Sequence, residues 1–272
     1  MSAPTQSPSR PHVEVAPVSQ ARVLRSEWIK LRSLRSTTLT LVAAVVAMIV
    51  LAWVVGWATN AHWNTMDPGE RAQFNAVDRS LAGVNLAQLA IGVLGVLLIS
   101  GEYATGMIRA SLAAVPRRLP VLWAKSGLYA VITFALMLVA SLIAFVVGQH
   151  FLATHGTTLS APHAWRAIIG TAGYLTLIAM LAVALGFIIR STAGGIATLF
   201  GLLLVLPGIG QVLPMSWQVH TLPYLPSNAG AALYSAQPDP TVLSPATGLL
   251  VLVIWVAVAL SAAALLLKRR DA

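Results

Sequence analysis

The sequence predicts an all-α membrane protein whose chain crosses a bilayer six times. Three observations predict this fold class: six long apolar stretches, the absence of Asp, Glu, Lys and Arg inside them, and a charged fraction of only 9% with a mean hydropathy of +0.80. The stretches are 18 to 23 residues long, which suits a hydrocarbon core of about 30 Å crossed by helices that rise about 1.5 Å per residue. The six predicted spans are residues 38–58, 81–100, 128–148, 167–189, 196–213 and 247–267.

Positive charge is distributed unevenly between the two sides of these spans. Of the 17 Lys and Arg residues, 14 lie on the side that carries both chain ends, and only Arg71, Arg79 and Arg166 lie on the other. Cytoplasmic connections carry the excess of Lys and Arg, so we expect a multi-pass protein of the cytoplasmic (inner) membrane with both termini cytoplasmic. The same distribution explains the net charge of +9 and predicts membrane lipid, and no nucleic acid, as a partner.

The first 20 residues differ in composition from the rest of the chain. They are rich in Pro, Ser and Gln, which is typical of a disordered segment, so we expect residues 1–20 to be a cytoplasmic tail and residues 21–272 to be one six-span domain. The tail lacks the features of a signal peptide, and the first span is expected to be retained. The chain has no cysteine, which excludes disulfides, thiol catalysis and cysteine metal sites.

Residues 21–36, just before the first span, have the pattern of an amphipathic helix. Apolar side chains recur on one face at helical spacing, and the arginines lie mostly on other faces. Such a helix would lie in the headgroup region, with its tryptophan at the interface and its arginines reaching lipid phosphates. The alternative is a simple basic flank of the first span. The predicted residues of this membrane-interface helix are Leu24, Trp28, Leu31 and Arg32.

The connection between the second and third spans, residues 101–127, is long and not of low complexity. Gly106 is expected to turn the chain. Residues 107–114 are then expected to form a short helix that ends before Pro116, and residues 121–126 a separate segment that leads back into the membrane. A turn, a short helix and a second turn present a small rigid helix to a soluble partner. The alternative is a solvated basic loop.

Two stretches on this side are the most specific signals in the chain: residues 27–30 with Arg32 and Ser33, and the set Glu102, Tyr103, Gly106, Met107, Ile108 and Arg109. Together with the six spans, they resemble the membrane permease subunit of a bacterial ABC transporter of the type-2 exporter class, over essentially all of the chain after residue 20. In that family a connecting helix precedes the first span, and a coupling helix between the second and third spans docks into a groove of the ATPase subunit.

The resemblance implies that the six residues of the second stretch lie at or beside the contact with an ABC ATPase subunit. Because Glu102 and Arg109 lie at the membrane boundary, we also expect water to reach their charges. No phosphate-binding loop G-x-x-x-x-G-K-[ST] occurs in the sequence, so we expect ATP and magnesium in the partner ATPase. This chain is then a non-catalytic subunit that binds no cofactor itself. A second permease copy or a related permease would complete the pathway.

The opposite side of the membrane gives weaker signals. Five of the six histidines lie there, but no carboxylate accompanies the three in residues 149–166, so no metal site is predicted. The pair Pro68 and Gly69 predicts a turn. The link of residues 214–246 is rich in proline yet apolar, so we expect part of it to lie back on the bilayer surface as short helices. A packed cap is the alternative.

Within the spans, Asn85 and Gln88 are the most polar pair, and they either bond neighbouring helices or line a substrate route. No predicted span carries an acidic residue or a histidine, so nothing indicates a proton-driven carrier, and no acid, base and nucleophile set indicates a membrane hydrolase. The prediction is a permease that exports an unidentified lipid, peptide, antibiotic or drug. The alternative is a membrane anchoring or assembly protein that transports nothing.

Overall fold

The computed structural model describes residues 19–33, 35–115, 118–237 and 243–269, and these residues form helices and connecting turns without a β-strand. Six helical segments are long and apolar enough to cross a membrane. This confirms the predicted fold class and makes the chain a multi-pass membrane protein. The predicted disordered tail, residues 1–20, falls almost entirely outside the described residues.

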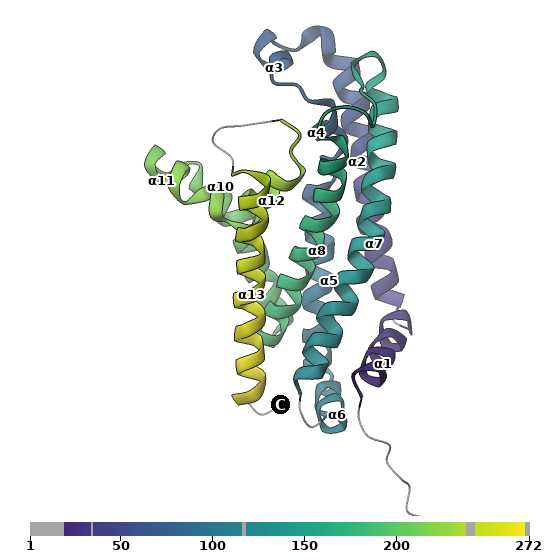
Figure 1. Cartoon of the computed structure of the whole chain (residues 1–272), viewed down its shortest axis with the longest axis vertical. Helices are drawn as coiled ribbons and strands as arrows, with labels where there is room; N and C mark the ends of the chain where they lie inside the picture. Colours follow the sequence, from purple (N-terminus) through teal and green to yellow (C-terminus); the bar gives the residue numbers. More distant parts are fainter. Residues whose placement is uncertain (1–18, 34, 116–117, 238–242, 270–272) are drawn as a thin grey trace, which may run out of the picture.

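The six spans run side by side in one bundle (Figure 1). The fifth span changes from α-helix to π-helix and back, and Pro207 follows the π segment. Because proline cannot donate a helical hydrogen bond, it accounts for the irregular turn. The spans are α2 (Arg35–His62), α5 (Val84–Ala104), α7 (Leu119–Leu152), α8 (Ala164–Ile189), α9 with η3 and α10 (Thr192–Phe200, Gly201–Val205 and Leu206–Gly210), and α13 (Pro245–Arg269).

Shorter helices flank the spans at the two ends of the bundle. α1 and α6 lie at the end where α13 finishes, whereas α3 and α4 lie at the opposite end (Figure 1). α12 packs against α8 and α13. These shorter helices are α1 (Gln20–Ser33), η1 (Trp63–Thr65), α3 (Pro68–Ala72), α4 (Ala76–Ser80), α6 (Met107–Ala114), η2 (Ala153–His155), α11 (Met215–His220), η4 (Leu222–Tyr224) and α12 (Pro226–Tyr234).

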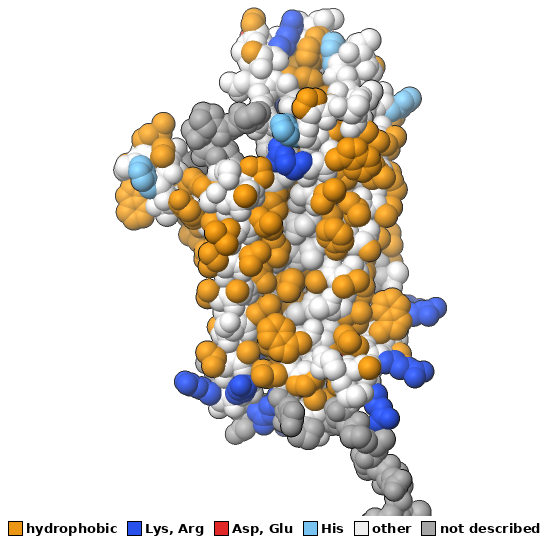
Figure 2. All heavy atoms as spheres, in the orientation of Figure 1, with side chains coloured by type: hydrophobic (Ala, Val, Ile, Leu, Met, Phe, Trp, Pro, Cys, Tyr) orange, Lys and Arg blue, Asp and Glu red, His pale blue; other side chains and the backbone are white. Residues whose placement is uncertain are grey.

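The surface has the charge distribution that the sequence predicts. Lys and Arg side chains gather at the end that carries α1 and α6, and hydrophobic side chains cover the length between the two ends (Figure 2). On α2, α7 and α13, the large exposed side chains include Leu39, Val131 and Val258. An apolar exterior between polar ends is what a bilayer requires of a helical bundle.

Two helices on the charged side run past the ends of the predicted spans. α5 runs through Glu102 to Ala104, and α7 starts at Leu119 and runs through Lys125, so residues 121–126 are not a separate segment. The charges do not end the helices because they are paired inside the protein, as described below. With 34 residues, α7 is about 51 Å long at about 1.5 Å per residue, which exceeds the roughly 30 Å of a hydrocarbon core.

Two features of the opposite side can be compared with the predictions. Pro68 begins helix α3 rather than forming a plain turn, because its fixed φ and missing N–H suit the first position of a helix. The link of residues 214–246 does contain short helices, as predicted. Of these, α12 buries Ala229, Gly230 and Ala232 against the bundle, so this part of the link is a packed cap.

The core lies along α5 and α8. In the most apolar window of each span, 61% of α8 and 56% of α5 is buried, against 22% for α2, the fifth span and α13. Small residues allow this approach: a Cβ added at Gly186 would lie 2.9 Å from Cβ of Ile99 on α5, and one at Gly170 would lie 2.2 Å from the Leu233 carbonyl oxygen on α12. Gly173 on the same helix, by contrast, has open space around it.

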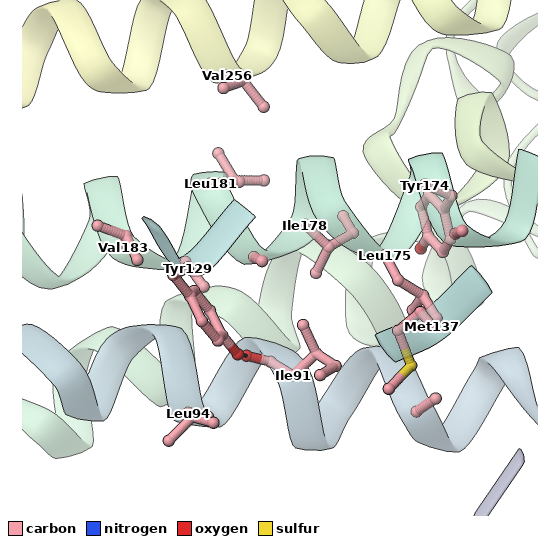
Figure 3. Packing of buried hydrophobic residues seen from close by; sticks show 14 of the residues in the cluster. Ile91, Leu94, Tyr129, Met137, Tyr174, Leu175, Ile178, Leu181, Val183 and Val256 are labelled. Carbon is pink, nitrogen blue, oxygen red and sulfur yellow. Dashed lines mark hydrogen bonds between the residues drawn. The ribbon is translucent and has the colours of Figure 1, made fainter. Parts of the chain in front are cut away.

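Polar groups inside the bundle are bonded across helices. Tyr129 on α7 points at α5 and donates a 2.6 Å hydrogen bond to the carbonyl oxygen of Ile91 (Figure 3). The tyrosine thereby satisfies its hydroxyl in a region without water and ties α7 to α5. In the same view, Val256 of α13 lies opposite Leu181 of α8.

Candidate functional site

The short helix α6 begins where the sequence predicts it. Gly106 has φ of +72°, a left-handed conformation that glycine adopts without steric cost. Its N–H donates to the Tyr103 carbonyl oxygen at 3.2 Å, and the chain turns there from α5 into α6. The predicted turn and the predicted helix of residues 107–114 are both confirmed.

α6 has a buried and an exposed face. Ile108 and Leu112 are buried in the core, whereas Met107 is 50% exposed and Arg109 and Ala110 are exposed. The helix is therefore anchored to the bundle by two aliphatic side chains and presents a methionine and an arginine outward. Methionine adapts to irregular partner surfaces, and arginine pairs with carboxylates, so the exposed part of α6, with Met107 and Arg109 on its two sides, has the chemistry of a protein contact.

Tyr103, the residue after Glu102, is half-buried at the end of α5. The guanidinium carbon of Arg190, which follows α8, lies 4.9 Å from the centre of its ring. This is within the range of a cation–π contact. Tyr103 therefore links the end of α5 to the end of α8, and its ring is not simply turned outward.

Behind α6 lies a four-residue ion cluster made of Glu27, Lys30, Glu102 and Lys125. Lys125 Nζ lies 2.6 Å from Glu27 Oε2 and 2.8 Å from Glu102 Oε1. Lys30 Nζ lies 3.0 Å from Glu27 Oε1 and 3.2 Å from Glu102 Oε1. Each ammonium thus lies between the same two carboxylates, and the four charges sum to zero.

The ion cluster joins three helices that lie far apart in the sequence. Glu27 and Lys30 belong to α1, Glu102 to the end of α5, and Lys125 to the start of α7. Lys30 also donates a 3.0 Å hydrogen bond to Ser111 Oγ on α6. The cluster therefore bonds α6 directly to α1, and it holds both helices against the base of the bundle.

The ion cluster is largely closed to water. The exposed fractions of the side chains are 4% for Glu27, 7% for Lys125, 11% for Glu102 and 30% for Lys30. The expectation that water reaches the Glu102 charge is therefore wrong, because α1 and α7 cover it. Arg109 is exposed as expected. Of the predicted contact residues, Glu102 and Ile108 point into the protein, so they support α6 from behind.

The carboxylates also keep Lys30 charged. Burial lowers the pKa of its ammonium, but the hydrogen bonds and charges of Glu27 and Glu102 raise it by more, so the pKa lies above the ordinary value of 10.5. An opposite charge at this distance favours the ionised form. All the electrostatic contacts of Lys30 are thus made as a cation at neutral pH.

The face of α1 that packs on the bundle differs from the predicted apolar stripe. Val23 and Glu27 are buried, whereas Leu24 and Trp28 are exposed. Leu31 is partly buried and Arg32 is exposed. The predicted membrane-interface residues thus lie largely on the side away from the protein, where lipid contact remains a prediction. The sequence signal that was missed is the spacing of positions 23, 27 and 30, which share one helical face.

The two polar residues predicted in the second span have different environments. Gln88 is buried, and its Oε1 accepts a hydrogen bond from the hydroxyl of Tyr174 on α8. Asn85 is exposed and donates to the carbonyl oxygen of Ala82, 3.3 Å away. Gln88 therefore makes a helix–helix contact, whereas Asn85 faces outward from the chain.

A second polar contact, which the sequence did not reveal, lies at the opposite end of the bundle. Asp78 on α4 accepts hydrogen bonds from the Ala236 N–H at 2.6 Å and from Ser235 Oγ at 3.3 Å. Arg166 on α8 donates to the Ser235 carbonyl oxygen at 2.7 Å and to two carbonyl oxygens at the end of α12. Cations suit the carbonyl end of a helix, so these two charges fix the end of α12.

Burial raises the pKa of Asp78 above its ordinary value of 3.8, although its hydrogen bonds and the Arg166 charge lower it. In the described part of the chain, no group of three or more possible metal ligands occurs, the nearby histidines included. His155 instead stacks on Trp63, with ring centres 3.7 Å apart.

A hollow of about 400 Å³ lies between α11, η4 and α12 and is lined mainly by apolar side chains such as Met215 and Val219.

One family of known proteins matches a region that includes both stretches singled out in the sequence. A family model described as ABC-2 family transporter protein matches residues 23–208. The match covers more than half of the chain, from α1 into α10, and includes the ion cluster and all of α6. A search among curated proteins finds no match.

Proposed function

The chain belongs to the ABC-2 transporter family, and we propose that it is the permease subunit of an ATP-driven exporter in the cytoplasmic membrane. Family membership makes the chain a membrane transport component; the export direction, the drive by ATP and the partners are our proposal. The ATPase is a separate chain that binds ATP and magnesium, since no phosphate loop occurs in the 272 residues. A second copy or a related permease completes the pathway.

The observation that carries the proposal is the exposed face of α6. This helix begins at a fixed turn, is anchored by Ile108 and Leu112, and turns Met107 and Arg109 outward at the basic end of the bundle. Positive charges that served only to orient the chain in the membrane would not need a helix anchored in this way. Movement of a partner protein can displace the bundle if the partner holds a rigid, exposed helix of this kind.

The proposed mechanism follows from the connections of α6. Closure of the ATPase subunits on ATP displaces α6, which leads directly from α5 and is followed by α7. α5 packs on α8, and α7 packs on both α8 and α2. Displacement at α6 thus reaches the core of the bundle and shifts it between inward and outward access. The substrate is a lipid, peptide, antibiotic or drug, since the spans offer no charge signature that selects among them.

Charge reversal on α6 tests the ATPase contact. We propose that Arg109 pairs with a carboxylate of the ATPase. Arg109→Glu would place a second acid at this contact, and like charges at an interface are costly. At equal membrane abundance, we expect it to lower the amount of co-purifying ATPase at least ten-fold. The matched control is Arg269→Glu, which reverses an exposed charge at the same end of the bundle and should leave the amount unchanged. Equal recovery with Arg109→Glu would overturn the proposed contact.

The orientation is tested separately with single cysteines, which this cysteine-free chain allows. Gly69 on α3 and Ala113 on α6 are both exposed, at opposite ends of the bundle. In intact cells, a membrane-impermeant thiol reagent should label Gly69→Cys and should label Ala113→Cys only after lysis. The reverse pattern would place α6 outside the cell and contradict an ATPase contact there.

A further inference from the structure

We propose that α1 is a working part of the coupling unit, and that Glu27, Lys30 and Lys125 are positioning residues that make α1, α6 and the start of α7 move as one body. The inference rests on the proposed function in one respect, the docking of an ATPase on α6. The one-body claim itself concerns only contacts within this chain. It gives α1 a role beyond lying on the membrane.

The first step is that Glu27 and Lys125 cannot touch a partner themselves. Glu27 and Lys125 are 4% and 7% exposed, and they lie behind α6 rather than on its outer face. Any effect they have on an ATPase must therefore pass through the position of α6. The path is short: Lys30 bonds Ser111 of α6 and both carboxylates of the ion cluster.

The second step is that α1 is fixed to the bundle along its length. Gln20 Nε2 at its first turn donates a 3.3 Å hydrogen bond to the carbonyl oxygen of Pro120 at the start of α7. One turn on, Val23 is buried in the core, and Glu27 follows in the ion cluster. α1 packs mainly on α7 and less on α2, the span that it precedes. It is thus seated on the helix that follows α6.

The third step concerns the balance of charges in the ion cluster. Each lysine lies between two carboxylates, so removing one charge leaves the other three with an unbalanced buried charge. Removing one acid and one base together leaves the neutral pair Lys30 and Glu102, 3.2 Å apart. The double variant should therefore be better ordered than either single variant. If these side chains only filled space, the double variant, which changes two of them, should be less well ordered than either single variant.

The experiment measures the distance between α1 and α6. Spin labels go on Ser26→Cys and Ala110→Cys, two exposed positions in a chain without native cysteine, and pulsed electron resonance gives the distance distribution in lipid nanodiscs. We expect a narrow distribution for the otherwise native chain and at least a doubling of its width for Glu27→Gln or Lys125→Met. The double variant Glu27→Gln with Lys125→Met should recover a narrow distribution.

Two controls and a second readout separate the possible failures. Glu70→Gln, which removes an exposed carboxylate at the other end of the bundle, should leave the width unchanged. Single variants with native width, or a double variant as broad as the singles, would overturn the one-body claim. Co-purification of the ATPase should fall with each single variant and recover in the double. If the distances respond but co-purification does not, the one-body claim stands and the docking role of α6 is wrong.

Discussion

Replacing Glu102 with alanine should loosen α1 and α6 from the bundle without changing the exposed face of α6. Glu102 accepts from Lys125 at 2.8 Å and from Lys30 at 3.2 Å. Its removal leaves two ammonium groups that share Glu27 alone. Removing one member of a buried ion pair typically costs about 3–5 kcal/mol.

Three features of the ion cluster reduce this cost. Glu27 remains as a counter-ion for both lysines, Lys30 is 30% exposed, and Glu102 Oε2 accepts no hydrogen bond from the described residues. We therefore expect a cost at or just below the bottom of that range, about 2–3 kcal/mol of local stability. At about 1.4 kcal/mol for each factor of ten, this raises the population of the opened state about 30- to 150-fold.

The assay uses a single cysteine at Val23, which is 5% exposed on the inner face of α1. A thiol reagent reaches it only when α1 opens, so the labelling rate follows the local opening equilibrium. Glu102→Ala should raise the rate about 30- to 150-fold, whereas Arg109→Ala, at an exposed position, should change it less than about two-fold. A native labelling rate in Glu102→Ala would mean that the ion cluster does not hold α1.

Other parts of the bundle give three further predictions. Tyr174→Phe leaves the buried Oε1 of Gln88 without its donor and should cost about 1–3 kcal/mol in thermal unfolding; if Gln88→Leu in the same chain recovers none of it, the hydrogen bond is not the cause. Gly148→Ala places a Cβ 2.4 Å from a side-chain oxygen on α4, whereas Gly127→Ala meets nothing within 4 Å, so only the first should lower the free energy of unfolding, by about 1–3 kcal/mol. Because the folded pKa of Asp78 lies above 3.8, the folded state binds that proton more tightly; the contribution of Asp78 to stability should fall as the pH rises from about 3.8 through the folded pKa. Asp78→Asn should remove this slope, and an unchanged slope in thermal unfolding against pH would assign it to another group.

Local signals predicted the spans and α6 well because each depends on residues close together in the chain. The six apolar stretches follow from composition, and the turn before α6 follows from Gly106. The ends of the spans were less predictable. Pairing lowers the cost of a charge in a membrane helix, and the pairing of Glu102 and Lys125 was not visible in the sequence.

The ion cluster depends on the packing of three helices. Glu27 and Lys125 are 98 positions apart, and no periodicity connects them. Two weak signals existed: Val23, Glu27 and Lys30 share a face of α1, and two of the only three lysines in the chain belong to the cluster. Neither signal identifies the partner on another helix.

The environments of Asn85 and Gln88 illustrate the same limit. The two positions lie about 60° apart around a helix, because three residues turn it by about 300°. Such neighbours are expected to share a face, yet one is exposed and the other is bonded to Tyr174. Which side of α5 meets α8 depends on the small residues that allow close approach, and the sequence alone does not rank them.

The central claim is that α6 docks an ATPase, and site-specific photo-crosslinking tests it most directly. A photoreactive amino acid at Met107, which is 50% exposed on α6, should give a crosslinked product that contains a phosphate-loop ATPase. The same amino acid at Gly69, exposed at the opposite end of the bundle, should give no such product. If Met107 captures no ATPase from membranes in which the transporter is active, or if Gly69 captures it equally well, α6 is not the coupling helix.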